Sequence, residues 1–319
     1  MIQTMFLCAG LGTRLRPLTE ALPKPMVPLG DRPVLGQLMQ RLARAGGTPR
    51  AVNVHYRSEA VVHYLEGQDP TVYVSRESEL LGTAGGVRAA VGSFAREPLV
   101  VWNSDIVTQP DLLALVRGLE QSPLALLVEP KPAGAGNVGV DEKGRIVRLR
   151  CSSVAEESRG GSYVGILAMR PDCFAHLPKR GCLIGDVAIP LMDSYEGIMA
   201  IPHLARWSDI GTLQTYHQVN LRWLAEEADA RAWCAPTAEV DRSVDLDCSI
   251  VGAGARVIGE GRLEQVVVWP GAHCSAPLRN AIVTREAGVI PVSVDPCRNE
   301  QDPASSASCN PMNGVRSSR

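Results

Sequence analysis

The sequence has few aromatic residues and no excess of either charge. In 319 residues there are only 3 Phe, 5 Trp and 6 Tyr, and 32 Lys and Arg stand against 34 Asp and Glu. Few aromatic rings argue against the stacking platforms that bind single-stranded nucleic acid. A near-neutral chain also lacks the basic surface that holds a polyanion. We therefore expect no nucleic-acid partner, and a few placed residues must hold any phosphate ligand.

Metal-binding cysteine patterns and long apolar runs are also missing. The 9 cysteines include no C-x-x-C pair, and the 6 histidines are not clustered. A zinc knuckle or a thioredoxin-type site is therefore not visible, and free thiols in a reducing cytosol are the favoured interpretation. No apolar run approaches ~18 residues, and the N-terminal segment lacks the basic region of a signal peptide. We expect a soluble, cytoplasmic protein without a membrane partner.

Strand and helix patterns alternate over the first two thirds of the chain. Apolar segments at residues 5–9 and 99–102 end in glycine or polar residues, whereas residues 33–45 carry apolar positions at helical spacing. This alternation predicts an α/β, Rossmann-like domain over residues 1–231, with a mixed, mostly parallel sheet. Ligands of such sheets bind beyond the carboxyl ends of the strands. Further strands are expected at residues 51–55, 71–75 and 124–128, and further helices at residues 58–66 and 110–119.

The pattern changes after residue 231, where short apolar triplets alternate with glycine, alanine and proline. Three similar pentapeptides begin at Pro236, Ala253 and Pro270, with 17 residues between successive starts. Small residues at corners and a constant period are typical of a β-solenoid. We predict a short left-handed β-helix of about three coils over residues 232–295, with irregular hairpins as the alternative. Residues 296–319 are polar and Ser-rich, which predicts a disordered tail.

A glycine-rich segment follows the first expected strand. Residues 9–14 read AGLGTR, and glycines after a strand let backbone N–H groups approach phosphate oxygens. Arg14 is placed to bind an oxyanion bidentately. Position 15 is leucine and no Gly-Lys-Ser/Thr follows, so neither a dinucleotide fingerprint nor a Walker A loop is present. Lys24 lies between two prolines, in a stiff segment that can direct its charge at a phosphate.

Together the segments GLGTRLRPLT and PKPM resemble those of the sugar-1-phosphate nucleotidylyltransferases, also called NDP-sugar pyrophosphorylases. The similarity is closest to the mannose-1-phosphate guanylyltransferases. The resemblance implies a nucleotidyltransferase catalytic domain, and a C-terminal β-helix is common in this family. Further segments resemble family motifs in the same order: LGTAGG at 81–86, NSD at 103–105, NVGV at 137–140, SYVGI at 162–166 and WSDIGT at 207–212.

The resemblance assigns roles to individual residues. Arg14 and Lys24 are the expected catalytic cations, and Asp105 and Asp209 are the expected Mg²⁺ ligands. The structural alternatives are a helix cap for Asp105 and a turn before Gly211 for Asp209. The expected nucleotide-binding residues are Ala9, Gly10, Gly12, Thr13, Gly82, Thr83, Gly85 and Gly86. The expected sugar-phosphate-binding residues are Asn137, Gly139, Arg150 and Gly165.

One family segment is missing. After residues 144–147 the family usually carries F-x-E-K-P, whose lysine binds the sugar phosphate, but here residues 148–153 read RLRCSS. We hypothesise that Arg150, or failing that Arg148, supplies the missing positive charge. The alternative is that sugar-1-phosphate binding is weakened or lost.

The implied reaction is an in-line attack of a sugar 1-phosphate on the α-phosphorus of a nucleoside triphosphate, with pyrophosphate leaving. We expect GTP and mannose 1-phosphate, because residues 81–85 are closest to the guanylyl branch. Residues 52–56 resemble two branches, so UTP with an amino sugar such as N-acetylmuramate 1-phosphate is the alternative. A catalytically silent, nucleotide-sugar-sensing regulatory subunit is an alternative of another class. The β-helix is expected to pack on the catalytic domain or to form a homo-oligomer contact.

Overall fold

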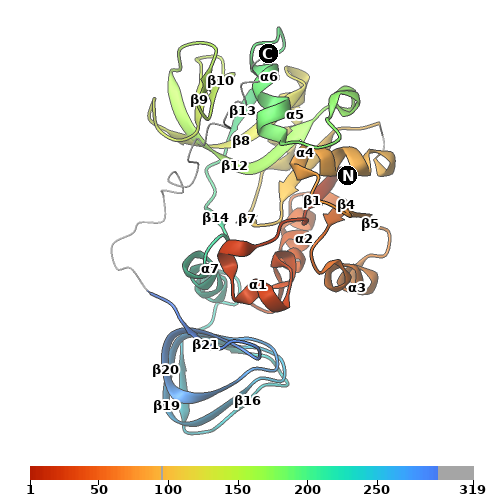
Figure 1. Cartoon of the computed structure of the whole chain (residues 1–319). Coiled ribbons are helices and arrows are strands. Elements are labelled where there is room, and N and C mark those ends of the chain that lie inside the picture. Colours follow the sequence, from red (N-terminus) through yellow and green to blue (C-terminus); the bar gives the residue numbers. More distant parts are fainter. Residues whose placement is uncertain (95, 294–319) are drawn as a thin grey trace, which may run out of the picture.

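The computed structural model describes residues 1–94 and 96–293, which form two parts (Figure 1). The larger part is built around a ten-stranded sheet, and the smaller part is a stack of short strands that begins at residue 232. Helix α7 (Leu213–Glu226) lies between them. The expected disordered tail, residues 296–319, lies outside the described residues.

The strands of the large sheet are β1 (Ile2–Leu7), β4 (Gly47–Val54), β5 (Tyr73–Arg76), β6 (Leu99–Asn103), β8 (Leu124–Lys131), β9 (Val138–Val140), β10 (Ile146–Leu149), β11 (Ser152–Ser153), β12 (Arg159–Met169) and β13 (Met199–Pro202). On one side, β6, β1, β4 and β5 pair in parallel in that order. β12 then runs antiparallel to β6, β8 and β9, so the sheet is mixed. The Rossmann-like α/β fold is confirmed.

The helices follow the amphipathic segments of the sequence. The α-helices are α1 (Leu18–Ala21), α2 (Val34–Arg44), α3 (Ser58–Gln68), α4 (Gly82–Ala90), α5 (Leu112–Arg117), α6 (Ile189–Met192) and α7. The expected elements are present with ends shifted by a few residues. The expected strand at 5–9 is wrong at its end, because β1 stops at Leu7 and the Cys8 N–H donates to the Asn53 side chain at 2.8 Å.

Alternate residues of the central strands face opposite sides of the sheet and build two cores. Phe6 and Trp102, with ring centroids 5.5 Å apart, belong to the core that α2 and α3 cover. Met5 and Val101 belong to the core that α4 covers. Helices thus cover both faces, and the carboxyl ends of β1, β4 and β6 are left as the edge where a ligand can bind.

The smaller part is a domain of stacked, mostly parallel strands, called the solenoid below. Ile250 pairs in parallel with Val267, and Glu239 with Arg256, so that these neighbouring strands are offset by the expected 17 residues. Val267 also pairs with Ile282, after a register shift that reduces the offset to 15 residues, and these buried side chains form one apolar ladder. The left-handed β-helix stays a prediction. The strands are β15 (Ala232–Cys234), β16 (Glu239–Val240), β17 (Val244–Asp247), β18 (Ser249–Val251), β19 (Arg256–Val268), β20 (His273–Thr284) and the antiparallel β21 (Gly288–Pro291).

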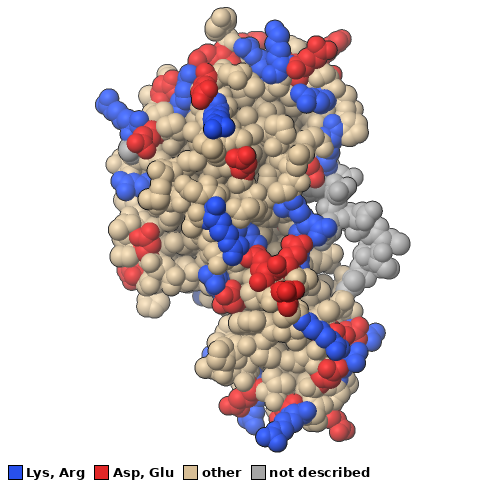
Figure 2. Space-filling view, turned by 180° about the vertical axis from the view of Figure 1, so that it is seen from behind, with Lys and Arg blue, Asp and Glu red and all other residues tan. Residues whose placement is uncertain are grey.

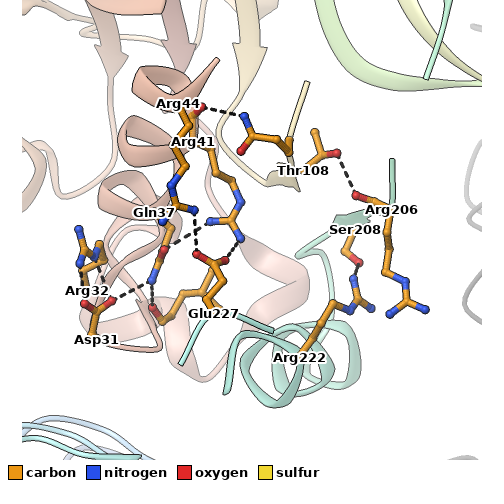
Figure 3. A network of polar contacts seen from close by, with 12 residues as sticks. Asp31, Arg32, Gln37, Arg41, Arg44, Thr108, Arg206, Ser208, Arg222 and Glu227 are labelled. Carbon is orange, nitrogen blue, oxygen red and sulfur yellow. Dashed lines mark hydrogen bonds and ion pairs between the residues drawn. The ribbon is translucent and has the colours of Figure 1, made fainter. Parts of the chain in front are cut away.

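Helix α7 joins the two parts by polar contacts as well as by packing. At its C-terminal end, Glu227 forms ion pairs with Arg41 and with Arg44 of α2 (Figure 3). On its other side, Trp269 of the solenoid donates a hydrogen bond to Tyr216 of α7 at 2.9 Å. The solenoid therefore packs on the larger part, which is the first of the two expected arrangements, and the homo-oligomer contact stays a prediction.

The surface carries no large field of one sign on the face that Figure 2 shows, where acidic and basic side chains lie interspersed. This agrees with the formal net charge of −2. Among the described residues, no helix has both the length and the apolar composition needed to cross a membrane.

Candidate active site

The glycine-rich segment forms an open turn beyond the carboxyl end of β1. Gly12 has a φ of 63° and precedes a short 3-10 helix (Thr13–Leu15). The Thr19 hydroxyl donates a hydrogen bond to the Gly12 carbonyl at 2.7 Å. A β-carbon on Gly10 would meet no described atom within 4 Å. Ala9 is buried, whereas Gly10 and Thr13 are exposed. Exposed backbone N–H groups of such a turn suit phosphate oxygens.

Four charged side chains from distant parts of the chain meet beside this turn. Lys24 Nζ lies 2.8 Å from Asp105 Oδ2 and 3.7 Å from Asp209 Oδ1, and an Arg14 nitrogen lies 3.7 Å from Asp209 Oδ2. The Lys24 side chain is only 12% exposed. The two carboxylates are brought together by strand pairing, because β7 (Ile106–Thr108) runs antiparallel to β14 (Trp207–Asp209). The expected catalytic and metal-binding residues therefore form one cluster.

The electrostatics of this cluster centre on Asp209. Burial and the neighbouring charge of Asp105 raise the pKa of Asp209, against the opposing effect of Lys24 and Arg14. Its buried Oδ1 has no hydrogen-bond partner among the described residues. The helix-cap alternative for Asp105 is wrong, because the cap of α5 is Asp111, whose side chain accepts the Ala114 N–H at 2.9 Å. The turn expected for Asp209 is present, because the Asp209 carbonyl at the end of β14 accepts the Gly211 N–H at 2.9 Å, but this turn does not involve the Asp209 carboxylate.

The two carboxylates fit Mg²⁺ as expected from the sequence. Among residues 1–94 and 96–293, no group of three or more His, Cys, Asp or Glu side chains is arranged to hold a metal ion. Mg²⁺ in enzymes that bind phosphates usually takes one or two carboxylates and completes its shell with phosphate oxygens and water. Asp209 Oδ1 lies 3.7 Å from the Lys24 ammonium but accepts no hydrogen bond among the described residues, so it can serve as a ligand atom for such an ion.

A second feature is a pocket of about 230 Å³ next to the cluster. It brings together Thr83 from the expected nucleotide set with Asn137 and Arg150 from the expected sugar set. Asn103, which lines the pocket, ends β6 two residues before Asp105, so the pocket lies on the Asp105 side of the carboxylate cluster. The described residues that line the pocket are Thr83, Asn103, Asn137, Leu149, Arg150, Tyr163, Cys182, Leu183 and Ile184.

Arg148 and Arg150 were the two candidates to replace the missing lysine, and of these two only Arg150 lines the pocket. Arg150 has a left-handed backbone (φ 56°), and its guanidinium contacts the Cys182 sulfur at 3.5 Å. Arg148 instead forms a two-point ion pair with Glu157 and donates to the carbonyls of Gly136 and Val138. Arg148 therefore ties strands together, and Arg150 is the cation that faces the pocket.

Comparison with known proteins assigns the fold to a family. The model of the family described as "Nucleotidyl transferase" matches residues 3–226. The chain belongs to the nucleotidyl transferase family. A mannose-1-phosphate guanyltransferase of Schizosaccharomyces pombe is 30% identical over 231 residues. A UTP–glucose-1-phosphate uridylyltransferase of Synechocystis is 28% identical over 240 residues.

These matches cover 67% and 68% of this chain and 62% of each relative, so the chain spans less than two thirds of their length. Among solved structures, HddC from Yersinia pseudotuberculosis, in a crystal structure titled as a complex with GMP-PN, has a TM-score of 0.59. It is 21% identical, and the match covers 70% of this chain and 100% of HddC. This likeness supports the fold.

In this member of the family the expected nucleotide-binding residues 82–86 lie in a helix. Residues 82–86 form the first turns of α4, and their glycines allow close packing of protein backbone. A β-carbon on Gly82 (φ 73°) would lie 2.4 Å from the Gly181 carbonyl, and one on Gly85 would lie 2.6 Å from the Lys179 carbonyl. The Thr83 hydroxyl accepts the Leu183 N–H at 2.7 Å. That these residues and Gly86 also contact a base stays a prediction.

The expected sugar-binding glycines also have packing roles. Gly165, with a φ of 90°, lies against Ile106 and Asn103, where a β-carbon would approach to 2.7 and 3.1 Å. Gly139 lies under the Arg148–Glu157 ion pair, and the residues that line the pocket do not include it. Gly139 is therefore not brought to the pocket, whereas Gly165 supports the Asn103 side chain that lines it.

Six residues that line the pocket were missing from the expected site, and three of them carry polar groups: Asn103, Tyr163 and Cys182. Burial raises the pKa of Tyr163 and keeps its phenol neutral. Burial alone would raise the pKa of Cys182, but backbone hydrogen bonds and the Arg150 charge lower it below its usual value. Asn103 and Tyr163 stand inside the recognised segments NSD and SYVGI, which was a usable signal. No comparable signal marks Cys182.

Proposed function

We propose that this protein transfers a nucleotidyl group from a nucleoside triphosphate to a sugar 1-phosphate and releases pyrophosphate. The observation that carries the proposal is the position of the Lys24–Asp105–Asp209 cluster next to the pocket that contains Arg150. One side offers groups for a triphosphate, and the other offers a cation and polar side chains for a phosphorylated sugar. GTP and mannose 1-phosphate are the proposed pair.

The proposed mechanism depends on positioning and charge neutralisation. The backbone of residues 10–13 and the Arg14 guanidinium hold the β- and γ-phosphates. The Lys24 ammonium balances charge at the α-phosphate, where the sugar phosphate oxygen forms the new P–O bond as pyrophosphate leaves. No general base is required, since the attacking phosphate is already an anion. Mg²⁺ held by Asp105 and Asp209 supplies further charge neutralisation when bound.

Arg150 takes the role of the missing family lysine in this proposal. Its guanidinium contacts the Cys182 sulfur, whereas the Arg148 guanidinium is held by a carboxylate and two carbonyls. An arginine facing a phosphate can form two charge-assisted hydrogen bonds. Asn137 and Tyr163, which are joined by a 2.9 Å bond from the Tyr163 N–H to Asn137 Oδ1, lie across the same pocket and suit sugar hydroxyls.

The relatives favour two nucleotides. The S. pombe protein, with 30% identity, is named a guanyltransferase, which supports GTP and mannose 1-phosphate. The Synechocystis protein, with 28% identity, is named a uridylyltransferase. This name supports UTP as the second candidate nucleotide, and the amino sugar, such as N-acetylmuramate 1-phosphate, comes from the sequence resemblance of residues 52–56.

Pyrophosphate release tests the proposal directly. The full chain is incubated with Mg²⁺, each of four nucleoside triphosphates and a set of sugar 1-phosphates. The expected result is release with GTP and mannose 1-phosphate at a rate at least about tenfold above the other pairs. Release with UTP and an amino sugar 1-phosphate would favour the second pair. Absence of release with every pair would reject the enzyme and favour a nucleotide-sugar-sensing regulatory subunit.

A further inference from the structure

A chain of buried contacts connects the solenoid to the turn that follows Lys24. Trp269, directly after β19, donates from Nε1 to the Tyr216 hydroxyl at 2.9 Å. Tyr216 in turn donates to the Pro28 carbonyl at 2.5 Å. Tyr216 is fully buried and Trp269 is nearly so. Pro28 begins β2 (Pro28–Leu29), four residues after Lys24, so the solenoid and the catalytic lysine are separated by one tyrosine and a short stiff segment.

A second set of contacts reaches the same turn. Trp233 of the solenoid packs edge-on against Trp223 of α7, with ring centroids 5.7 Å apart and an interplanar angle of 88°. The Trp223 indole lies flat against Gly30, where a β-carbon would fall 2.1 Å from the ring. The Gly30 N–H donates to Asn220 Oδ1 at 3.0 Å. The turn at residues 28–30 is therefore held by α7 from two sides.

The same helix also fixes the other half of the catalytic cluster. Thr212, three residues after Asp209, caps the start of α7. The Thr212 side chain accepts the Thr215 N–H, and the Thr215 side chain accepts the Thr212 N–H. Arg222, further along the helix, donates to the Ser208 hydroxyl at 2.9 Å (Figure 3). Because α7 holds both the Lys24 turn and the strand that ends at Asp209, its position sets the separation of the two charges.

The solenoid in turn holds α7. His217, next to Tyr216 on the helix, forms a 2.7 Å hydrogen bond between Nε2 and the Gln265 carbonyl of β19. Tyr216, Val219 and Trp223 are buried, and they belong to the same core as the solenoid residues Ile250, Val267 and Trp269. Without the solenoid this face of α7 would be exposed to water, and the helix would lose much of its packing.

From these contacts we propose that Trp269 of the solenoid is a positioning residue for Lys24, acting through Tyr216 and Pro28. Trp269 then supports catalysis from outside the site, although it touches no reacting group. The proposal rests on the proposed nucleotidyl transfer, in which Lys24 must be aligned with the α-phosphate. Small misplacements of such groups are costly, and a shift of about 1 Å can lower a rate 100-fold.

The test compares three variants of the full chain. Tyr216→Phe removes both hydrogen bonds, Trp269→Phe removes the donor and keeps an aromatic ring, and Ile282→Val removes one buried methyl group of the solenoid as the matched control. We expect kcat for pyrophosphate release to fall between about 10- and 100-fold in Tyr216→Phe and about 3- to 10-fold in Trp269→Phe. The control should keep its kcat. The KM for sugar 1-phosphate should not change in any variant, because the pocket lies elsewhere.

Backbone amide exchange of residues 24–30 supplies a readout that is independent of activity. We expect these amides to exchange at least about fivefold faster in Tyr216→Phe and Trp269→Phe, and at the wild-type rate in Ile282→Val. Unchanged exchange in both aromatic variants overturns the proposal, and so does an equal loss of kcat in the control. If wild-type protein releases no pyrophosphate, the proposed function fails, but the exchange comparison still decides the coupling. If Tyr216→Phe does not fold, Trp269→Phe decides the test.

Discussion

Lys24 lies mostly shielded from solvent between two carboxylates, whereas Arg150 faces an open pocket and contacts a thiol. The Lys24 ammonium is ion-paired with Asp105 at 2.8 Å. The Arg150 guanidinium contacts a weak acceptor, and its charge is open to an anionic ligand. The two halves of the site thus differ in whether protein or substrate satisfies the cation. In the proposed function, the Lys24 side therefore holds the reacting phosphate in a fixed geometry. The Arg150 side provides affinity for the sugar 1-phosphate.

The strongest test of the fixed half is the loss of one carboxylate charge. We expect Asp209→Asn to lower kcat for pyrophosphate release by about 100- to 1,000-fold, because asparagine is a poorer ligand for the Mg²⁺ that would neutralise charge at the transferring phosphate. The thermal midpoint should not fall, since burial and Asp105 disfavour the charged form of Asp209. Asp111→Asn, which keeps a good helix cap on α5, is the control and should leave kcat unchanged. Equal rates in Asp209→Asn and wild type would remove Asp209 from the mechanism.

Arg150→Ala tests the open half and should act on affinity instead of rate. We expect the KM for sugar 1-phosphate to rise about 10- to 100-fold with little change in kcat, as for loss of hydrogen bonds to a charged group. Titration of initial rates against sugar 1-phosphate measures both constants. An unchanged KM for sugar 1-phosphate would show that Arg150 does not replace the missing family lysine.

The sequence predicted the fixed half better than the open half. Arg14, Lys24, Asp105 and Asp209 lie in segments that resemble family motifs, and the structure brings them within ion-pair distance. The β7–β14 pairing that joins the carboxylates depends on long-range register, which local pattern does not encode.

At the open half, the local pattern leaves more undetermined. Gly82 and Gly85 were expected to bind the nucleotide, and in the structure they lie close to protein backbone. A glycine that admits protein backbone is indistinguishable in sequence from one that admits a ligand. The left-handed φ of Arg150 and the approach of Cys182 from a segment 32 residues later are equally invisible to local pattern.

A stability measurement tests the structural role of Arg148, which is paired with Glu157. Glu157 accepts from Arg148 and from the Gly134 N–H, and the Arg148 hydrogen bond is the main reason that its pKa is lowered. A lowered carboxyl pKa contributes stability that is present above pH about 4.5 and is lost as the pH falls below it. We expect Glu157→Gln to cost about 1 to 2 kcal/mol of unfolding free energy at pH 7, and less at pH 3. Urea unfolding at both pH values measures this, and an equal cost at both would reject the ion pair as its source.

The smallest expected effect concerns two thiols, one beside each half of the site. Burial raises the pKa of Cys8 to about 12, with Asp105 adding to the shift, whereas backbone hydrogen bonds and Arg150 outweigh burial at Cys182 and lower its pKa. At pH 7.5 an alkylating reagent should therefore label Cys182 and leave Cys8 unlabelled, because the thiolate is the reactive form. Arg150→Ala should slow labelling of Cys182 about two- to fivefold, since it removes the charge that favours the thiolate. Peptide mass spectrometry over a time course measures each site separately. Saturating sugar 1-phosphate should also slow labelling of Cys182 if the sugar phosphate occupies the pocket. If neither Arg150→Ala nor sugar 1-phosphate slows the labelling, Cys182 and Arg150 do not share one pocket.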